Sequence, residues 1–433
     1  MESKEDTTAP AASVGNDSSK PTKTNSKPII AISITFLIFV LSIIIYFCIF
    51  YKKGRAVPYD KPIPYIFNQD FLSALNEYVS LPTHNEILVI YGPKGVGKTR
   101  GLFEFGNMVY DDGRLVIDFD FQKMSKAANM DDIVVYIRKT IGKYLMKYSE
   151  MHLRSDNELK NKLNIIETLT SMYKENNNYN SIDLKMFTFR DQVYQELLNQ
   201  LFFITEIILE DSKYGLDLLL KSLNLLDNWK PVIIIHDLDN IQENDFILEL
   251  IKSLSMFIEN QKNIGIIIEV SDQKALFDGT FPINNHKFRY YYVNEFSNKE
   301  IKNLLVKDNI FSKKDMEYII DHFGHNGQLY ATVHDMMREG NDVMSAYQKF
   351  KRHYSNIILR FIEYNSTSKI RAKRVAFLNK LFDEQRIPIN TDLDISHSLI
   401  EWKIITMSNL THCMYQNKVM QDSANEILQI FNK

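Results

Sequence analysis

Cysteine is scarce in this sequence: Cys48 and Cys413 are the only two among 433 residues. Cys48 lies inside an apolar run and far from Cys413 along the chain, so a bridge between them is disfavoured. Two cysteines cannot supply the disulfide framework of a small secreted domain. The bulk of the chain is therefore expected in an intracellular, reducing compartment.

An excess of charge of either sign is also missing. The 51 Lys and Arg residues nearly balance the 54 Asp and Glu residues, which leaves a formal net charge of −3. The whole chain thus has no electrostatic drive toward DNA or RNA, although a local basic patch stays open. Hydrophobic residues at 45% and charged residues at 24% are close to globular averages and argue against a wholly disordered, collagen-like or rod-like chain.

Several catalytic signatures are absent as well. The sequence has no His and Cys cluster at metal-binding spacing, no Gly-x-Ser-x-Gly turn and no protein kinase signature set. It also shows no internal repeat at the periods of solenoid proteins. The sequence therefore gives no support for a protease, a lipase, a protein kinase or a solenoid protein.

Residues 29–51 are predicted to form one membrane-spanning helix. From Pro28 to Tyr51 there is no charged residue. At ~1.5 Å rise per residue, about 22 apolar residues cover the ~30 Å hydrocarbon layer, whereas the core of a signal peptide is about half as long. Lys52, Lys53 and Arg55 come directly after the apolar run, as expected where a helix leaves the membrane. The chain is thus predicted to be a single-pass membrane protein.

The flanking segments indicate the orientation of this helix. Residues 1–28 are rich in Ser, Thr, Pro and Lys, show no apolar periodicity, and are predicted to be a disordered tail. Residues 52–80 are predicted to form a linker and a leading helix. More positive charges lie after the membrane helix than before it, which favours a cytoplasmic location for the C-terminal side of the chain. The charges before it are Lys20, Lys23 and Lys27, and those after it are Lys52, Lys53, Arg55 and Lys61.

The strongest chemical signal is the segment from Gly92 to Thr99, which fits Gly-x-x-x-x-Gly-Lys-[Ser/Thr] between an apolar strand, Ile87 to Tyr91, and a helical pattern. Glycines in such a loop let successive backbone N–H groups face a phosphate at the positive end of a helix. Lys98 adds a mobile charge, and the Thr99 hydroxyl is suited to ligate magnesium that bridges the outer phosphates. The sequence therefore predicts a site for ATP and Mg2+, formed by Gly92, Pro93, Lys94, Gly95, Val96, Gly97, Lys98, Thr99 and Arg100.

A phosphate loop needs a second buried strand that ends in a carboxylate, and residues 231–240 are the candidate. Their β-branched run is typical of a central parallel strand, whose carboxyl edge is where open parallel sheets bind ligands. Asp237 is the predicted magnesium ligand beside Thr99, and Asp239 the catalytic carboxylate that polarises water. In the alternative register His236 occupies the ligand position and Asp237 is the catalytic carboxylate. Turnover would then be poor, since a neutral imidazole is a weak ligand for a hard cation.

Three further segments, 114–120, 264–270 and 288–293, have the composition of short buried strands and are separated by helical patterns. This alternation predicts βα units and hence an α/β fold with a parallel sheet. The residues after the fourth strand, Glu269 to Asp272, do not match the Asn-Lys-x-Asp pattern that reads guanine, which disfavours a GTPase.

Together these motifs resemble the P-loop ATPases of the AAA+ and STAND groups, in particular the archaeal-type ATPase domain family, from about Glu86 onward. The resemblance is carried by YGPKGVGKT, LVIDFD, WKPVIIIHDLDNI, IGIIIEVSD and VNEFSNKEI. Two features depart from the family pattern. Asp and then Glu usually follow the apolar strand, where this chain has His236, Asp237, Leu238 and Asp239, so both registers stay open. The turn at 323–328 lacks the proline of a Gly-Gly-x-Pro-like turn. The resemblance implies a P-loop ATPase fold with a small helical lid. Assembly into a homo-oligomer is an open alternative.

The chain is expected to divide into a P-loop ATPase domain over 81–296, a helical lid over 297–365 and a small winged-helix-like domain over 366–433. A helical insertion at about 150–228 is longer than one crossover needs, and is either a partner-binding module or ordinary core. The last domain holds the most basic stretch, a candidate contact for nucleic acid or acidic lipid, or else a solvated helix face. A membrane tether disfavours a role on genomic DNA.

Two functions remain open from the sequence. One is a membrane-anchored ATPase, with its ATPase domain in the cytosol, whose nucleotide cycle moves the lid and the C-terminal domain. The other is a nucleotide-binding scaffold or partner-recruitment protein at a membrane, without useful turnover.

Overall fold

The structure is a computed structural model that describes most of the chain from Asn68 onward. The described residues are 68–124, 128–152, 159, 162–167, 192–238, 244–260, 263–271, 273–276, 281, 285–308, 311–409 and 412–432. Among them, no helix is both long and apolar enough to cross a membrane. The predicted tail at 1–28 and membrane helix at 29–51 lie outside the described residues and stay predictions.

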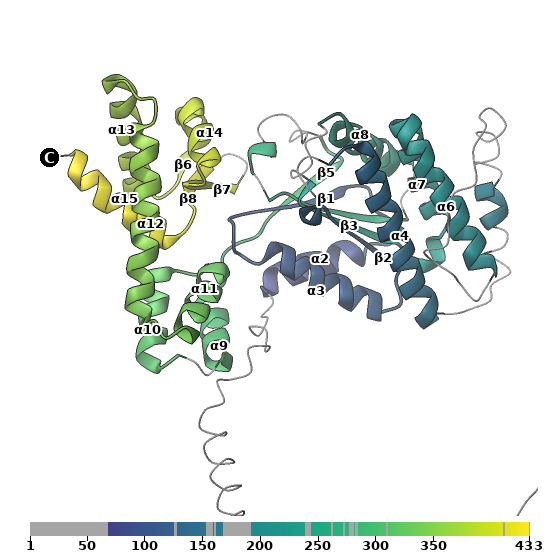
Figure 1. Cartoon of the computed structure of the whole chain (residues 1–433), viewed down its shortest axis with the longest axis horizontal. Coiled ribbons are helices and arrows are strands. Elements are labelled where there is room, and N and C mark those ends of the chain that lie inside the picture. The colour runs from purple at the N-terminus through teal and green to yellow at the C-terminus, as the bar shows by residue number, and fades with distance from the viewer. Residues whose placement is uncertain are drawn as a thin grey trace, which may run out of the picture. The chain divides into compact units, whose positions relative to one another are not determined.

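A parallel sheet of five strands forms the centre of the fold (Figure 1). The strand order is β2-β3-β4-β1-β5, and every neighbouring pair is parallel. Each strand lies within or beside a segment predicted from the sequence, so the predicted parallel-sheet α/β fold is confirmed. The strands are β1 (Ile87–Tyr91), β2 (Val116–Asp120), β3 (Val232–His236), β4 (Gly265–Glu269) and β5 (Phe288–Tyr292).

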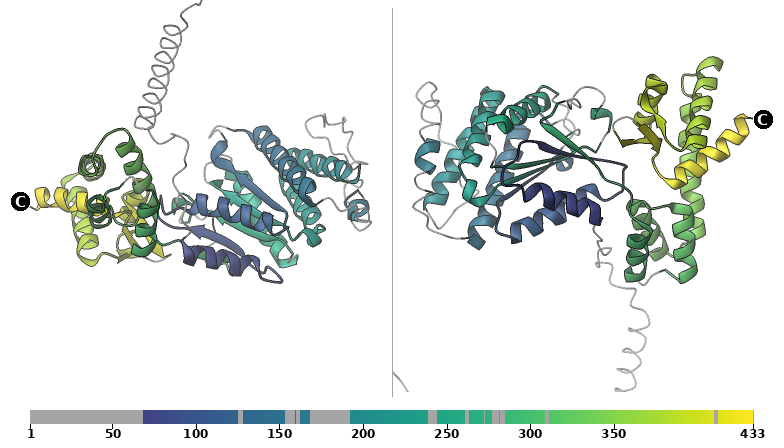
Figure 2. Two further views of the ribbon diagram at one scale, coloured as in Figure 1. Left: turned by 90° about the horizontal axis from the view of Figure 1, so that it is seen from below. Right: turned by 180° about the vertical axis from the view of Figure 1, so that it is seen from behind.

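Every residue of β1, β3 and β4 is buried, because helices cover both faces of the sheet (Figure 2). Ile234 faces α3, where a methyl group on Gly106 would come within 3.3 Å of its side chain. Ile233 and Ile235 face the other side of the sheet, toward α7 and α8. Two-sided burial explains the unbroken apolar runs of these strands. The helices of this domain are α2 (Gln69–Val79), α3 (Lys98–Asp111), α4 (Met130–His152), α6 (Gln192–Glu210), α7 (Ser212–Asn224) and α8 (Asn244–Asn260).

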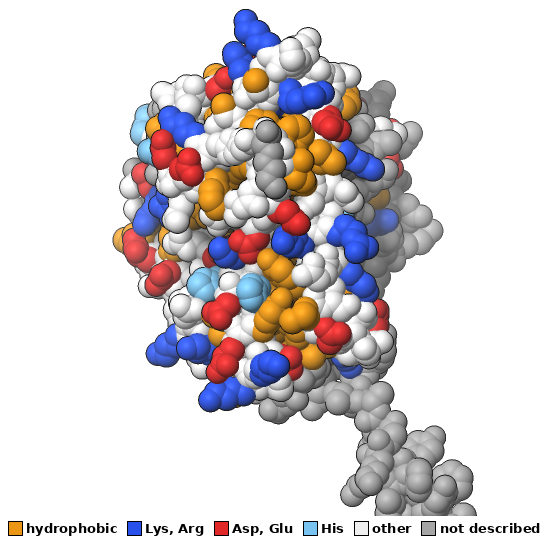
Figure 3. Space-filling view, turned by 90° about the vertical axis from the view of Figure 1, so that its left-hand side faces the viewer, with side chains coloured by type: hydrophobic (Ala, Val, Ile, Leu, Met, Phe, Trp, Pro, Cys, Tyr) orange, Lys and Arg blue, Asp and Glu red, His pale blue; other side chains and the backbone are white. Residues whose placement is uncertain are grey.

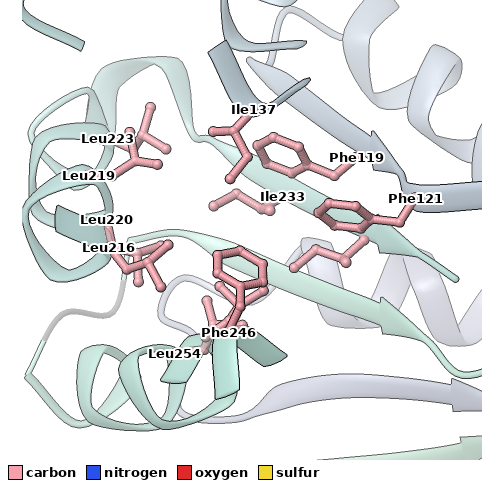
Figure 4. A pocket seen from close by; sticks show the side chains of 12 residues that line it. Phe119, Phe121, Ile137, Leu216, Leu219, Leu220, Leu223, Ile233, Phe246 and Leu254 are labelled. Atoms are coloured by element: carbon pink, nitrogen blue, oxygen red, sulfur yellow. The ribbon is translucent and has the colours of Figure 1, made fainter. Parts of the chain in front are cut away.

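A small apolar cavity of about 40 Å³ lies between the sheet and these helices (Figure 4). Phe119 and Phe121 border it from β2 and the turn after it, Leu216 and Leu220 from α7, and Phe246 from α8. Helices α6 and α7 fall within the predicted insertion, and α6 has an apolar stripe that is fully buried, as at Leu197, Leu201 and Ile204. In the described part of the insertion, these stripes therefore belong to the core.

The chain after β5 forms a helical region and then a small mixed region. Four helices build the first part around their own apolar core, which includes Ile301, Phe323 and Val333. They are α9 (Asn298–Asp308), α10 (Lys313–Phe323), α11 (Gly327–Arg338) and α12 (Val343–Glu363). Short strands in the order β6-β8-β7 form an antiparallel sheet in the second part. Its elements are α13 (Ser368–Glu384), β6 (Ile387–Pro388), α14 (Leu393–Glu401), β7 (Ile405–Asn409), β8 (His412–Tyr415) and α15 (Lys418–Phe431).

Basic side chains at the start of the C-terminal region are exposed to solvent, as at Lys369, Arg371 and Lys373. Figure 3 views the side of the molecule at which α10, α12, α13 and α15 lie, and positive and negative side chains are interspersed over it. Arg374 is used internally, because its guanidinium donates to the carbonyl oxygens of Phe361 at 2.6 Å and Tyr364 at 2.7 Å. This pattern matches the solvated helix face that the sequence left open.

Candidate nucleotide site

The predicted phosphate loop connects the central strand β1 to α3. Gly95 and Gly97 have φ values of 89° and 88°, a region that side-chain-bearing residues rarely adopt. Gly97 is the N-cap of α3, so the helix begins at Lys98 and Thr99 lies in its first turn. The first N–H groups of a helix lack internal partners and carry its positive dipole end. The loop therefore has the geometry of an anion site.

Lys98 lies at the centre of this loop. Its Nζ atom donates to the carbonyl oxygens of Gly92 and Pro93, both at 3.0 Å, and the residue is only 6% exposed. An ammonium held by backbone carbonyls of the loop itself is in position to meet a phosphate that enters the loop.

Thr99 contacts a carboxylate that the sequence analysis did not assign to the site. Its hydroxyl donates to Oε1 of Glu269 at 2.7 Å. Glu269 is the last residue of β4 and is 1% exposed. One signal was available in the sequence: a glutamate at the end of the apolar run Gly265 to Ile268 has to be buried, and a buried carboxylate needs a partner.

His236, the last residue of β3, joins Glu269 to a third strand end. Its Nδ1 atom lies 2.7 Å from Oε2 of Glu269. Its Nε2 atom lies 3.0 Å from Oδ1 of Asp118 on β2, an ion pair rather than a well-aligned hydrogen bond. Burial alone would lower the pKa of His236, but its contacts with Asp118 and Glu269 and their negative charges raise the pKa to about 10. These two carboxylates therefore favour the protonated, cationic form of the imidazole.

Asp237 lies one residue beyond the strand, in a turn. It has a φ of 50° and is 6% exposed. Burial raises the pKa of its carboxyl group, and a hydrogen bond with Ser271 opposes that rise. His236, not Asp237, therefore faces the carboxylate that holds Thr99. The other predicted carboxylate, Asp239, lies outside the described residues, so the assignment of metal ligand and catalytic carboxylate stays a prediction.

The oxygen atoms at Thr99 suit a magnesium ion. A hydroxyl and a carboxylate 2.7 Å apart are the hard ligands that this cation prefers. Within the described ranges, no group of three or more His, Cys, Asp or Glu side chains forms a protein-only metal site. Magnesium in nucleotide sites is usually held by one or two protein ligands together with phosphates and water, so the donor set fits such an ion.

The N-terminus of α11 contacts the phosphate loop directly. The side-chain amide of Asn326 donates to the carbonyl oxygen of Lys94 at 2.7 Å, and the backbone N–H of Gln328 donates to that of Gly95 at 3.0 Å. A methyl group on Gly95 would come within 2.4 Å of the Asn326 side chain. The turn at 323–328, which lacks the proline usual in the family, is thus hydrogen-bonded to the phosphate loop.

A second link joins the sheet to the C-terminal region. Gln273 comes after β4, and its side-chain amide donates to Oγ1 of Thr406 on β7 at 2.8 Å. Its Oε1 atom accepts the backbone N–H of Met407 at 2.7 Å. Gln273 and Thr406 are 6% and 2% exposed, so the link is buried.

No protein-family model and no curated protein matches the sequence. Among solved structures, the chain is similar to a Walker-type ATPase of Pyrococcus abyssi, with 13% identity, a TM-score of 0.49, and coverage of 83% of this chain and 96% of that one. It is also similar to Cdc6p from Pyrobaculum aerophilum, with 10% identity, a TM-score of 0.38, and coverage of 86% and 97%. A third similarity is to the Aeropyrum pernix Orc1 protein in complex with DNA, with 11% identity, a TM-score of 0.32, and coverage of 87% and 96%. The resemblance to P-loop ATPases is carried by the sequence motifs and by the geometry of the loop.

Proposed function

We propose that this chain is a membrane-anchored protein that binds ATP with magnesium at the loop Gly92–Thr99 and hydrolyses it to move its lid and C-terminal regions. The observation that carries the proposal is the loop itself. A buried central strand leads through left-handed glycines to a helix that begins at Lys98, with the lysine ammonium inside the loop. This geometry presents backbone N–H groups and a positive charge to phosphate oxygens.

The contacts of the lid support coupling between nucleotide and conformation. Asn326 and Gln328 donate hydrogen bonds to carbonyl oxygens of the loop. A phosphate group that changes the shape of the loop therefore changes the position of the N-terminus of α11. From α11 the chain continues through the long helix α12 to residues 366–433, which we interpret as a winged-helix-like domain. Motion of the lid would thus reach the end of the chain.

Magnesium would be held by Thr99 and one carboxylate, and would neutralise charge on the outer phosphates. Asp237 is the carboxylate that the sequence predicts, and Glu269 is the one that contacts Thr99. When Glu269 serves this role, Asp237 is left as the group that polarises the attacking water, in line with the alternative register.

A second candidate is a scaffold that binds nucleotide without useful turnover, and His236 favours it. A protonated imidazole stands at the end of β3, where a metal-binding carboxylate is usual in the families that the chain resembles. It occupies one oxygen of Glu269 and contacts Asp118. Measurement of turnover by the purified chain separates the two candidates.

We further propose that residues 29–51 span a membrane, with the ATPase domain in the cytosol, where ATP is abundant. The positive charges after this segment and its uncharged apolar length support the proposal. Protease treatment of sealed membranes tests it, since the domain is then digested from the cytosolic side. Protection of the C-terminal region together with cleavage of the tail would reverse the orientation. The same proposal includes binding of a protein partner by the helical insertion and assembly of the chain into a homo-oligomer.

The nucleotide proposal is tested by thermal unfolding of the full chain in detergent. A ligand that binds only the folded state at a hundredfold excess over its Kd raises stability by about 2.7 kcal/mol. ATP with magnesium should therefore raise the melting temperature of the wild type and of Lys213→Ala, an exposed lysine of α7, but not of Lys98→Ala. A folded wild-type chain whose melting temperature does not respond to millimolar ATP or GTP would refute nucleotide binding.

A further inference from the structure

A second and larger cavity, of about 630 Å³, opens beside the phosphate loop. Its walls are the first two turns of α3, the ends of β2 and β3, and one face of α4. Thr99 and His236 belong to its lining, so the cavity shares a wall with the nucleotide site. Its volume lies within the range of about 300–1,000 Å³ that is typical of small-molecule sites.

The inner wall of this cavity is largely buried, and it carries polar groups within a lining whose surface is mostly apolar. Thr140 is 7% exposed and His236 is 2% exposed. The Tyr136 hydroxyl lies beside Asp120, where it accepts the backbone N–H at 2.6 Å and donates to the backbone carbonyl at 2.8 Å. The hydroxyl and carboxylate groups of this wall suit hydroxyl or amino groups of a ligand, and the apolar surface around them suits the carbon atoms of the same ligand.

Two of the acidic groups at the cavity have cationic partners, Asp120 with Lys123 at 2.7 Å and Glu104 with Arg100 at 3.8 Å. The third, Asp118, contacts the imidazole of His236. Two further cations line the cavity from successive turns of α4, Lys139 and Lys143. Neither forms an ion pair with an acidic residue of the described chain, and both are exposed. The cavity therefore has an excess of positive charge on the α4 side of its opening.

We propose that this cavity binds a phosphorylated small molecule with hydroxyl groups, distinct from the nucleotide, whose phosphate is held by Lys139 and Lys143. Two ammonium groups one helical turn apart match the charge of a phosphate dianion. The polar groups of the inner wall receive the hydroxyl groups of this molecule. An apolar edge is available from Phe103, which lines the cavity and is 52% exposed.

Thr99 belongs both to this lining and to the proposed magnesium site, so the test omits nucleotide and can fail separately from the proposal of ATP binding. The test uses ribose 5-phosphate as the probe, with the full chain in detergent and without magnesium or nucleotide, and measures binding by calorimetry. The central variant is Lys139→Ala with Lys143→Ala. The matched control is Lys213→Ala with Lys221→Ala, which removes two exposed lysines from α7. Lys98→Ala serves to exclude binding of the probe phosphate in the loop.

Saturable binding of ribose 5-phosphate is expected for the wild type, the α7 control and Lys98→Ala alike. The α4 double variant should raise the Kd about tenfold while its melting temperature without ligand stays that of the wild type. Loss of binding in Lys98→Ala would place the probe in the phosphate loop and overturn the proposal. Equal weakening by the α4 and α7 variants would show nonspecific attraction and overturn it too. Absence of saturable binding at tens of millimolar probe would have the same consequence.

Discussion

The side-chain amide of Asn326 donates to the carbonyl oxygen of Lys94, although 232 residues separate the two along the chain. The same side chain caps α11, because its Oδ1 atom accepts the backbone N–H groups of Gln328 at 3.1 Å and Leu329 at 3.3 Å. One asparagine thus begins the lid helix and holds the phosphate loop. Helix cap and nucleotide loop are therefore connected through a single side chain.

The substitution Asn326→Asp separates these two roles. Aspartate still caps the helix, but it cannot donate to Lys94 and it adds a negative charge beside the loop. We expect the ATP affinity to fall about tenfold, equivalent to about 1.4 kcal/mol, while α11 stays folded. Titration with a fluorescent ATP analogue measures the affinity.

The same chemical change at another cap is the control. Asn417 caps α15 by accepting the backbone N–H of Met420 at 2.9 Å. Asn417→Asp should therefore leave the ATP affinity unchanged. Equal affinities for the Asn326 and Asn417 variants would show that the lid contact does not influence the loop.

Gly95→Ala should disturb both the loop and the lid. The backbone at Gly95 has a φ of 89°, and the added methyl group would come within 2.4 Å of Asn326 and 2.6 Å of Gln328. Gly340 has the same φ of 89° with nothing within 4 Å of such a methyl group. Gly340→Ala therefore measures the backbone strain alone, about 1–2 kcal/mol.

A clearly larger loss of unfolding free energy in Gly95→Ala, with loss of the ATP response, is expected in chemical denaturation. Equal losses of unfolding free energy in the two variants would mean that the lid moves to accommodate the methyl group without a further loss of stability.

The two carboxylates near the loop should differ in their effect on magnesium. Glu269→Gln should remove the magnesium-dependent part of the ATP affinity, because Glu269 contacts Thr99. Asp237→Asn should leave that affinity intact and reduce turnover, the behaviour of a group that acts only in the transition state. ATP titration with and without magnesium measures the first effect, and phosphate release the second.

The reverse pattern is equally informative. If Asp237→Asn weakens magnesium-dependent binding and Asp239→Asn reduces only turnover, Asp237 is the metal ligand that the sequence predicted. Glu269→Gln also leaves the His236 cation with one fewer partner, so its folding has to be checked by its melting temperature. Glu269→Asp, which keeps the charge, is the companion variant for that purpose.

His84 should make the protein less stable in mild acid. It is 4% exposed, packs with its ring centroid 4.9 Å from that of Tyr78, and its Nδ1 atom has no hydrogen-bond partner. Burial, and next the nearby Arg114, lower the pKa of His84 from 6.5 to about 4. Its contribution to stability is therefore present above pH 6.5 and is lost as the pH falls toward 4, with a slope of at most about 1.4 kcal/mol per pH unit.

Removal of the titrating group should abolish this slope. Urea denaturation of wild type and His84→Phe between pH 7 and pH 4 gives two stability curves. The difference between them isolates the histidine from the carboxylates, which titrate in both proteins. We expect the free energy of unfolding of the variant to rise relative to that of the wild type as the pH falls. Parallel stability curves would contradict the low pKa of His84.

The strands and most helices were predictable because their signals are local. The strand predicted at Ile87 to Tyr91 coincides with β1, and the leading helix predicted within residues 52–80 is α2. The terminal helix α15 was not predicted as a separate element of the winged-helix-like domain. Its Asn417 cap and its apolar spacing were the available signals.

The contacts that define the site were not predictable in the same way. His236, Glu269 and Asp118 belong to three different strands, and only the strand order brings them together. The contact of Asn326 with the loop depends on how the lid folds back, which no local pattern encodes. The sequence thus identified the loop residues from their spacing but could not show which carboxylate meets Thr99.

The buried hydrogen bonds of Gln273 determine whether β7 can move gradually relative to the sheet. Displacement of β7 would separate the Gln273 amide from Thr406 and Met407 at the same time, in a place where water cannot replace either partner. Each buried polar group left unpaired costs about 1–3 kcal/mol. Intermediate positions are therefore disfavoured, and the movement is expected to be a switch between two discrete states separated by a barrier, rather than a graded drift.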